Sequence, residues 1–171
     1  MTDSNHKVVV RKFYRRGCRI NQYGKTKAFQ RLLAYKPHYI YLIIKGNDLK
    51  ANINPINIEH KLTKLVLFLE ASTGAFVKLA DMEYRQEEEG KRTVEGYLKA
   101  RTNVNNKLKR SKLLRNKCMH LPFKKELQCD DGIHLSQYGI NVMNRVIKHK
   151  IERCMQRHDD LIANMRRAYR V

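Results

Sequence analysis

The stretch His-Tyr-Ile-Tyr-Leu-Ile-Ile-Lys-Gly-Asn-Asp, residues 38–48, decides how the rest of the chain is interpreted. Its centre, Tyr39 to Ile44, is an unbroken apolar run rich in β-branched and aromatic residues. Six residues are too few for a buried helix, and Pro37 keeps a helix from continuing into them. The run therefore predicts a central strand buried on both faces, as in a parallel sheet with helices on each side.

The strand ends abruptly in Lys45-Gly46-Asn47-Asp48. Gly46 tolerates backbone conformations that residues with a side chain avoid, so a turn is expected here. Polar residues that follow a buried parallel strand lie at the carboxyl edge of the sheet, where open α/β folds place their sites. Asn47 and Asp48 are therefore the first candidate site residues.

The flanking sequence predicts a strand–helix–strand unit. Apolar residues at 58, 62, 65, 66 and 69 recur at helical spacing, Pro55 suits the start of that helix, and Gly74 ends it. Ala75 to Ala80 then reads as a second buried strand. Further elements are expected as follows: a strand at Val8–Tyr14, a loop at Cys18–Thr26, a helix at Lys27–Tyr35, a helix over much of Val94–Leu114, an extended segment at Met119–Phe123, and one long helix or two from Gly139 onward. This order indicates an α/β protein.

Composition narrows the functional classes. The 171 residues include 36 Lys and Arg against 16 Asp and Glu, which gives a net charge of +20. Both halves carry the excess, so basic faces on a folded body are expected rather than one basic arm. Four widely spaced cysteines form no CxxC pair, so we expect no zinc site, no other cofactor and a reducing, intracellular environment, cytoplasmic or nuclear. No apolar run is long enough to span a membrane, and the N-terminus has no signal-peptide pattern.

The basic excess is densest between residues 107 and 117. Six of these eleven residues are basic, and they are the candidate nucleic-acid contacts: Lys107, Lys109, Arg110, Lys112, Arg115 and Lys117. Such a cluster favours contact with polyanions, but a solvated helix face is the more common origin of such a pattern. Both interpretations stay open at this point.

A second polar cluster, Asp131-Gly132-Ile133-His134-Leu135, stands just before the final helix. An Asp three residues before a His on a short loop can accept a hydrogen bond from one ring nitrogen, which leaves the other nitrogen available as a base. An Asn amide and a loop Gly N–H can both donate to a developing oxyanion. Together these residues predict the acid–base half of a nucleophile–base–acid triad.

With these motifs the chain resembles an SGNH (GDSL-type) hydrolase, in particular the divergent esterase-like domains of invertebrate genomes and non-LTR retrotransposons. The resemblance covers about residues 8–151. It implies a three-layer, flavodoxin-like parallel sheet with strand order 2-1-3-4-5, an acyl ester as substrate, and a serine nucleophile. By the resemblance, Asp131 and His134 match the acid and base, Gly17 matches one oxyanion-hole residue, and Asn47 matches the other.

Two departures from the family pattern limit what the resemblance implies. Lys45 stands where the third block has its first Gly. The nucleophile block, Gly-Asp-Ser after a first strand, has no match: Ser4 follows Asp3, but it lacks the preceding Gly and any strand before it. A nucleophile needs rigid support at the productive geometry, so Ser4 is not assigned this role.

The expectation is therefore an SGNH-like domain over residues 1–156 that lacks its first strand and nucleophile block, followed by a basic helical extension over residues 157–171. Full-length relatives would hydrolyse an ester, whereas this chain would be inactive by the covalent route because His134 has no serine to deprotonate. A gene model that starts at an internal Met and decay to a pseudoenzyme both account for this pattern. The alternative is a basic nucleic-acid-binding module of retroelement origin.

Overall fold

The structure, a computed structural model, describes residues 9, 11–13, 18–43, 46–49, 53–82, 93–121, 124–132 and 134–168. Along these ranges the elements follow in the order α1 (Ile20–Tyr23), α2 (Lys27–Tyr35), β1 (Tyr39–Leu42), η1 (Gly46–Asp48), α3 (Pro55–Thr73), β2 (Phe76–Ala80), α4 (Val94–Arg110), β3 (Cys118–Met119), η2 (Lys125–Leu127) and α5 (Gln137–Ala168). The η elements are short 3₁₀ helices. The alternation of strands and helices confirms the predicted α/β class.

The three strands form one parallel sheet in the order β1-β2-β3. β1 pairs with β2 from Tyr39 opposite Phe76 to Leu42 opposite Leu79. β2 then pairs with β3, which places Ala80 opposite Met119. All three carboxyl ends therefore point to the same edge of the sheet, so residues that follow neighbouring strands are brought close together.

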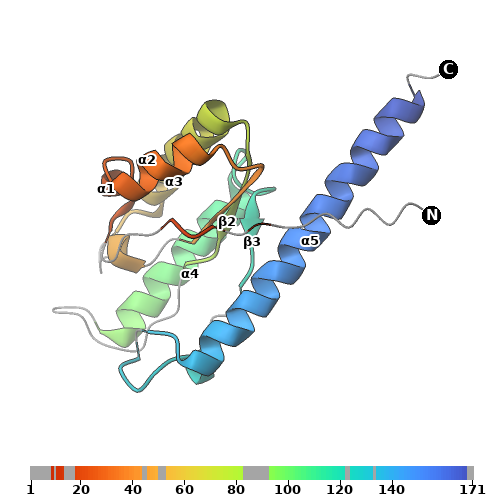
Figure 1. Cartoon of the computed structure of the whole chain (residues 1–171). Coiled ribbons are helices and arrows are strands. Elements are labelled where there is room, and N and C mark those ends of the chain that lie inside the picture. Colours follow the sequence, from red (N-terminus) through yellow and green to blue (C-terminus); the bar gives the residue numbers. More distant parts are fainter. Residues whose placement is uncertain are drawn as a thin grey trace.

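Two apolar clusters hold the three layers together (Figure 1). The larger cluster joins one face of the sheet to helices α1 to α4, and Leu62, Val66 and Val104 are fully buried in it. The smaller cluster joins the opposite face to α5 through Ala80, Leu121 and Met143. Burying one such aliphatic side chain contributes about 1.5–3 kcal/mol, so the larger cluster dominates stability.

Local signals set the helix boundaries much as the sequence predicts. Asn54 accepts a hydrogen bond from the backbone N–H of Ile56 (2.9 Å), Pro55 occupies the first turn, and Gly74 ends α3 with a φ of +71°. α2 runs over Lys27–Tyr35 as predicted, and Thr26 caps it by accepting from Phe29 N at 3.1 Å. These interactions lie within a few residues of each other, which is why the sequence reveals them.

The prediction for residues 39–44 needs correction. β1 lies at an edge of the described sheet, while β2 is the central strand. Its burial alternates, with Ile40 and Leu42 buried and Tyr39 and Tyr41 only partly buried. The reason is that Ile40 and Leu42 belong to the larger cluster with α1 to α4, whereas on the other face Tyr41 is only partly buried against the smaller cluster.

The predicted strand Val8–Tyr14 is also wrong where the structure describes it, because Val9 and residues 11–13 form no strand. Phe13 instead packs on the larger cluster, and its carbonyl accepts a hydrogen bond from the Tyr23 hydroxyl at 3.1 Å. The predicted loop Cys18–Thr26 contains the short helix α1. A distant residue stabilises that helix, as the next subsection shows.

The final helix is one element, which decides between the two predicted alternatives. α5 runs without a break from Gln137 to Ala168 and extends well beyond the other layers in Figure 1. The α5 residues that pack on the smaller cluster lie between Val142 and Ile147. The helix passes through residue 156 without interruption, so the division into residues 1–156 and 157–171 stays a prediction.

Candidate functional site

Asp131 and His134, the predicted acid and base, contact each other twice. Asp131 Oδ2 lies 2.6 Å from His134 Nδ1, and Oδ1 accepts a hydrogen bond from the His134 backbone N–H at 2.8 Å. An ionised carboxylate only accepts, so in this contact Nδ1 carries the hydrogen and Nε2 is the basic nitrogen. Both side chains are well exposed, at 44% for Asp131 and 65% for His134. The pair is therefore oriented and accessible to solvent.

The loop that carries this pair is built from backbone contacts. Gln128 and Leu135 form an antiparallel bridge, and Cys129 N donates to His134 O at 2.8 Å. Gly132 takes a φ of +62°, which is costly for residues with a side chain. These contacts close the turn that brings the carboxylate back to the imidazole.

The start of α5 fixes the other end of the loop. Ser136 Oγ accepts from Gly139 N at 3.0 Å and donates to Leu127 O at 3.2 Å. A Cβ on Gly139 would lie 1.9 Å from Leu127 O, so only glycine fits there. The pattern Asp-Gly-x-His-Leu-Ser-x-x-Gly thus has a structural reason at the Asp, both Gly, the His and the Ser.

The other predicted polar cluster, at the end of β1, has a structural use. The buried Asp48 carboxylate accepts from the backbone N–H of Ile20 at 2.8 Å and lies 3.7 Å from Lys61 Nζ. It thereby stabilises the first turn of α1, whose N–H groups have no partner within the helix. Asn47 lies beside it in η1 and is partly buried.

The remaining parts of the predicted triad stay predictions. Gly17, Lys45 and Ser4 lie outside the residues that the structure describes. The structure therefore brings together Asp131 and His134, places Asn47 at the carboxyl end of β1, and gives no arrangement for an oxyanion hole or a nucleophile.

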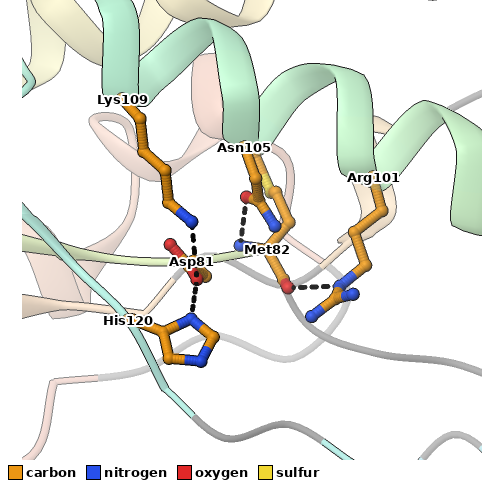
Figure 2. A network of polar contacts seen from close by, with 6 residues as sticks. All are labelled: Asp81, Met82, Arg101, Asn105, Lys109 and His120. Carbon is orange, nitrogen blue, oxygen red and sulfur yellow. Dashed lines mark hydrogen bonds and ion pairs between the residues drawn. The ribbon is translucent and has the colours of Figure 1, made fainter.

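A second histidine–aspartate pair, which was not predicted from the sequence, lies at the carboxyl edge of the sheet (Figure 2). Asp81 directly follows β2 and His120 directly follows β3, so the pairing of these parallel strands puts the two residues side by side. His120 Nδ1 lies 2.5 Å from Asp81 Oδ2, and Lys109 Nζ lies 4.0 Å from the same oxygen. The Asp81 side chain is only 6% exposed, whereas His120 is 67% exposed.

Side chains of α4 contact Asp81 and the residue that follows it, Met82. Asn105 Oδ1 accepts from Met82 N, and Arg101 Nε donates to Met82 O, both at 2.9 Å. Figure 2 shows Arg101, Asn105 and Lys109 on successive turns of α4, all pointing to the segment after β2. The helix is thus fastened to the residues that follow β2 by three polar side chains.

The buried Asp81 carboxylate affects the pKa values of two nearby groups, the Cys118 thiol and the Tyr41 hydroxyl. Burial, together with the smaller effect of the Asp81 charge, raises the pKa of the Cys118 thiol to about 11. Burial, and then the charge of Asp81, also raises the pKa of the Tyr41 hydroxyl. Among the described residues, that hydroxyl is buried without a hydrogen-bond partner. The charge of Asp81 therefore acts on two partly buried groups, one on β1 and one on β3.

The signal for the second pair was present in the sequence. The rule that singled out Asn47 and Asp48, polar residues after a buried strand, applies equally to Asp81 after the predicted strand Ala75–Ala80. His120 stands inside the predicted extended segment Met119–Phe123. If the strand Ala75–Ala80 and the segment Met119–Phe123 are taken as neighbouring parallel strands, their carboxyl ends bring Asp81 and His120 together.

The basic segment between residues 107 and 117 is partly committed to the fold. Lys107 pairs with Glu59 at 3.2 Å, Lys117 pairs with Glu70, and Lys109 faces Asp81. A hydrogen bond from Ser111, followed by the Lys107 contacts, lowers the pKa of Glu59. Arg110, Lys112 and Arg115 are exposed, and within the described part of the chain no carboxylate pairs with them. Nucleic-acid contact through this segment stays a prediction.

Comparison with known proteins adds no identification: no protein-family model, curated protein or solved structure matches the chain. Among the described residues, no three His, Cys, Asp or Glu side chains are grouped so that they hold a metal ion. None of the helices in this part of the chain is both long and apolar enough to cross a membrane.

Proposed function

We propose that the chain is an esterase-like domain of the SGNH type, in which His134 is the base and Asp131 its orienting acid. The observation that carries the proposal is the double contact between these residues, in a loop that Gly132, Ser136 and Gly139 shape. The parallel order β1-β2-β3 is compatible with the third, fourth and fifth strands of that fold. The substrate class is an acyl ester, attacked in full-length relatives by a serine.

The proposed chemistry assigns one proton transfer to this pair. His134 Nε2 would take the proton of a serine hydroxyl as that oxygen attacks the ester carbonyl, and would return it to the leaving alcohol. Asp131 holds Nδ1–H and favours the imidazolium that forms. Asn47 would donate to the oxyanion together with the N–H of Gly17. Ser4 is not assigned as the nucleophile in this proposal, and without a serine nucleophile the covalent route stops before its first step.

The test uses p-nitrophenyl acetate with three proteins: the chain itself, His134→Ala and His120→Ala. The His120→Ala variant is the matched control because it removes the other exposed, aspartate-bound histidine. All three should hydrolyse the ester at the same background rate. Turnover by the 171-residue chain that disappears only in His134→Ala would disprove the inactivity.

A second experiment tests the pair itself. A strand followed by Gly-Asp-Ser is fused to the N-terminus of the chain. The extended chain should hydrolyse the ester, and His134→Ala should lower that rate by at least about a thousandfold. An active extended chain that tolerates His134→Ala contradicts the assignment, as does an extended chain that folds and stays inactive.

A further inference from the structure

An open groove lies beside α2, away from both histidine–aspartate pairs. Its volume is about 460 Å³, and its lining consists of three cations, two aromatic rings and one alanine: Arg11, Lys12, Phe13, Arg31, Ala34 and Tyr35. The lining contains basic and aromatic side chains and no acidic residue. Such a groove favours a ligand that has both negative charge and a flat ring.

The aromatic side of the groove is held in place by the fold. Phe13 packs on the larger apolar cluster, and the Tyr23 hydroxyl donates to its carbonyl at 3.1 Å. The Tyr35 ring lies 5.7 Å from the Phe13 ring, tilted by 51°. Tyr35 is 44% exposed, whereas Phe29 and Leu32 on the same helix are buried. The groove therefore presents a positioned ring face to solvent.

The cations of the groove differ from those of the 107–117 segment. Arg11, Lys12 and Arg31 are exposed, and among the described residues none of them forms an ion pair with a carboxylate. Lys107 and Lys117 each neutralise a glutamate of α3. The groove cations thus keep their full attraction for an external anion, whereas two of the six cations in the segment are already paired with glutamates.

We propose that this groove binds single-stranded nucleic acid, with a base against the Tyr35 and Phe13 rings and neighbouring phosphates on Arg11, Lys12 and Arg31. Stacking on an aromatic ring beside a basic track is how sequence-tolerant single-strand sites work. The groove volume of about 460 Å³ lies in the range of small-ligand sites. A duplex keeps its base faces stacked and offers only phosphates, so it should bind more weakly. The site is separate from His134 and goes beyond the proposed esterase function.

The test measures fluorescence anisotropy of labelled 12-mers, one single-stranded DNA, one single-stranded RNA and one duplex, at several salt concentrations. The proteins are the wild-type chain, Tyr35→Ala, and the triple variant Arg11→Gln/Lys12→Gln/Arg31→Gln. A dispersed triple variant, Lys64→Gln/Lys99→Gln/Lys124→Gln, removes the same charge from exposed positions outside the groove. A rival triple variant, Arg110→Gln/Lys112→Gln/Arg115→Gln, tests the 107–117 segment. Circular dichroism verifies that each variant folds.

We expect single strands to bind more tightly than the duplex. The groove triple variant should bind at least tenfold more weakly. The slope of log affinity against log salt concentration should become less steep by about two, because three phosphate contacts are lost. Tyr35→Ala should lose about fivefold or more, in line with one stacked base. The dispersed variant should change affinity less than threefold. The proposal is overturned if the rival or dispersed variant loses as much as the groove variant, or if Tyr35→Ala has no effect. It is also overturned if anionic phosphatidylserine vesicles bind through the groove cations while the oligonucleotides do not.

Discussion

The two histidine–aspartate pairs use the same ring nitrogen and differ in their carboxylates. Both histidines are exposed and both place Nδ1 within 2.6 Å of a carboxylate oxygen. Asp81 is buried and shared with Lys109, whereas Asp131 is nearly half exposed and three residues from its partner. A buried ionised group is tolerated only with such partners, because leaving it unpaired is costly.

This difference indicates that the Asp81 pair stabilises the fold, whereas the Asp131 pair sets the chemistry of its histidine. The Asp81 pair joins the ends of β2 and β3 and faces α4, so its removal should lower the free energy of unfolding of the domain. The Asp131 pair lies on a solvated loop where its carboxylate is well hydrated, so its removal should mainly change the imidazole. The predictions below test that separation.

The largest effect is expected at Gly139, which supports the loop of the exposed pair. In Gly139→Ala the new Cβ meets the backbone carbonyl of Leu127, so η2 and α5 must move apart. We expect a loss of about 3 kcal/mol in the free energy of unfolding, measured by urea titration. Gly24→Ala is the control, because its Cβ would lie no closer than 3.9 Å to Phe29 and φ is already helical. A Gly139→Ala protein as stable as Gly24→Ala would show that the loop is not held as described.

The next effect is expected at the buried carboxylate. Asp81→Ala removes the acceptor of His120 and the partner of Lys109, and should lower the free energy of unfolding by about 2 kcal/mol. The same substitution at Asp131 should cost much less. Urea titrations of both variants at pH 7 measure this. Equal losses would remove the distinction between the two pairs.

The elements of the fold follow from the sequence wherever local interactions decide them. The helix over residues 27–35, the Pro55 start and Gly74 end of α3, and the Asp131–His134 contact all depend on residues a few positions apart. Helical spacing and turn residues carry that information.

What the sequence missed depends on contacts between distant residues. α1 needs Asp48, 28 residues away, to accept from its first turn, and His120 meets Asp81 across 39 residues. The edge position of β1 in the described sheet depends on which strands pair, which residues far apart in the chain decide. An apolar run such as Tyr39–Ile44 looks the same in an edge strand and in a central strand, so composition alone did not decide between them.

A smaller effect is expected in the two cysteines that report on the pairs. Cys118 lies near Asp81 and has a pKa of about 11, so only about 0.1% of it is thiolate at pH 8. Cys129 is exposed in the loop of the other pair. Iodoacetamide labelling followed by mass spectrometry should show Cys118 reacting at least about tenfold more slowly, and its rate should rise about tenfold per pH unit from 8 to 10.

The charge of Asp81 contributes to that slow reaction. Asp81→Asn should therefore speed the labelling of Cys118 and leave Cys129 unchanged. A rise of both rates by the same factor would indicate general unfolding instead. Fast labelling of Cys118 in the wild-type protein would contradict its burial beside the carboxylate.

The smallest effect on stability is expected from Asp131→Ala. The exposed pair should contribute less than about 1 kcal/mol to folding, because water solvates both partners when they separate. Its consequence lies in the imidazole: the carboxylate selects the Nδ1–H tautomer of His134, and without it the proton should redistribute to Nε2. Nitrogen-15 NMR of the neutral ring at pH 9 measures this, with His120 as an internal reference whose shifts should not change. If the His134 nitrogen shifts are the same in both proteins, Asp131 does not orient the ring, and the proposed base loses its support.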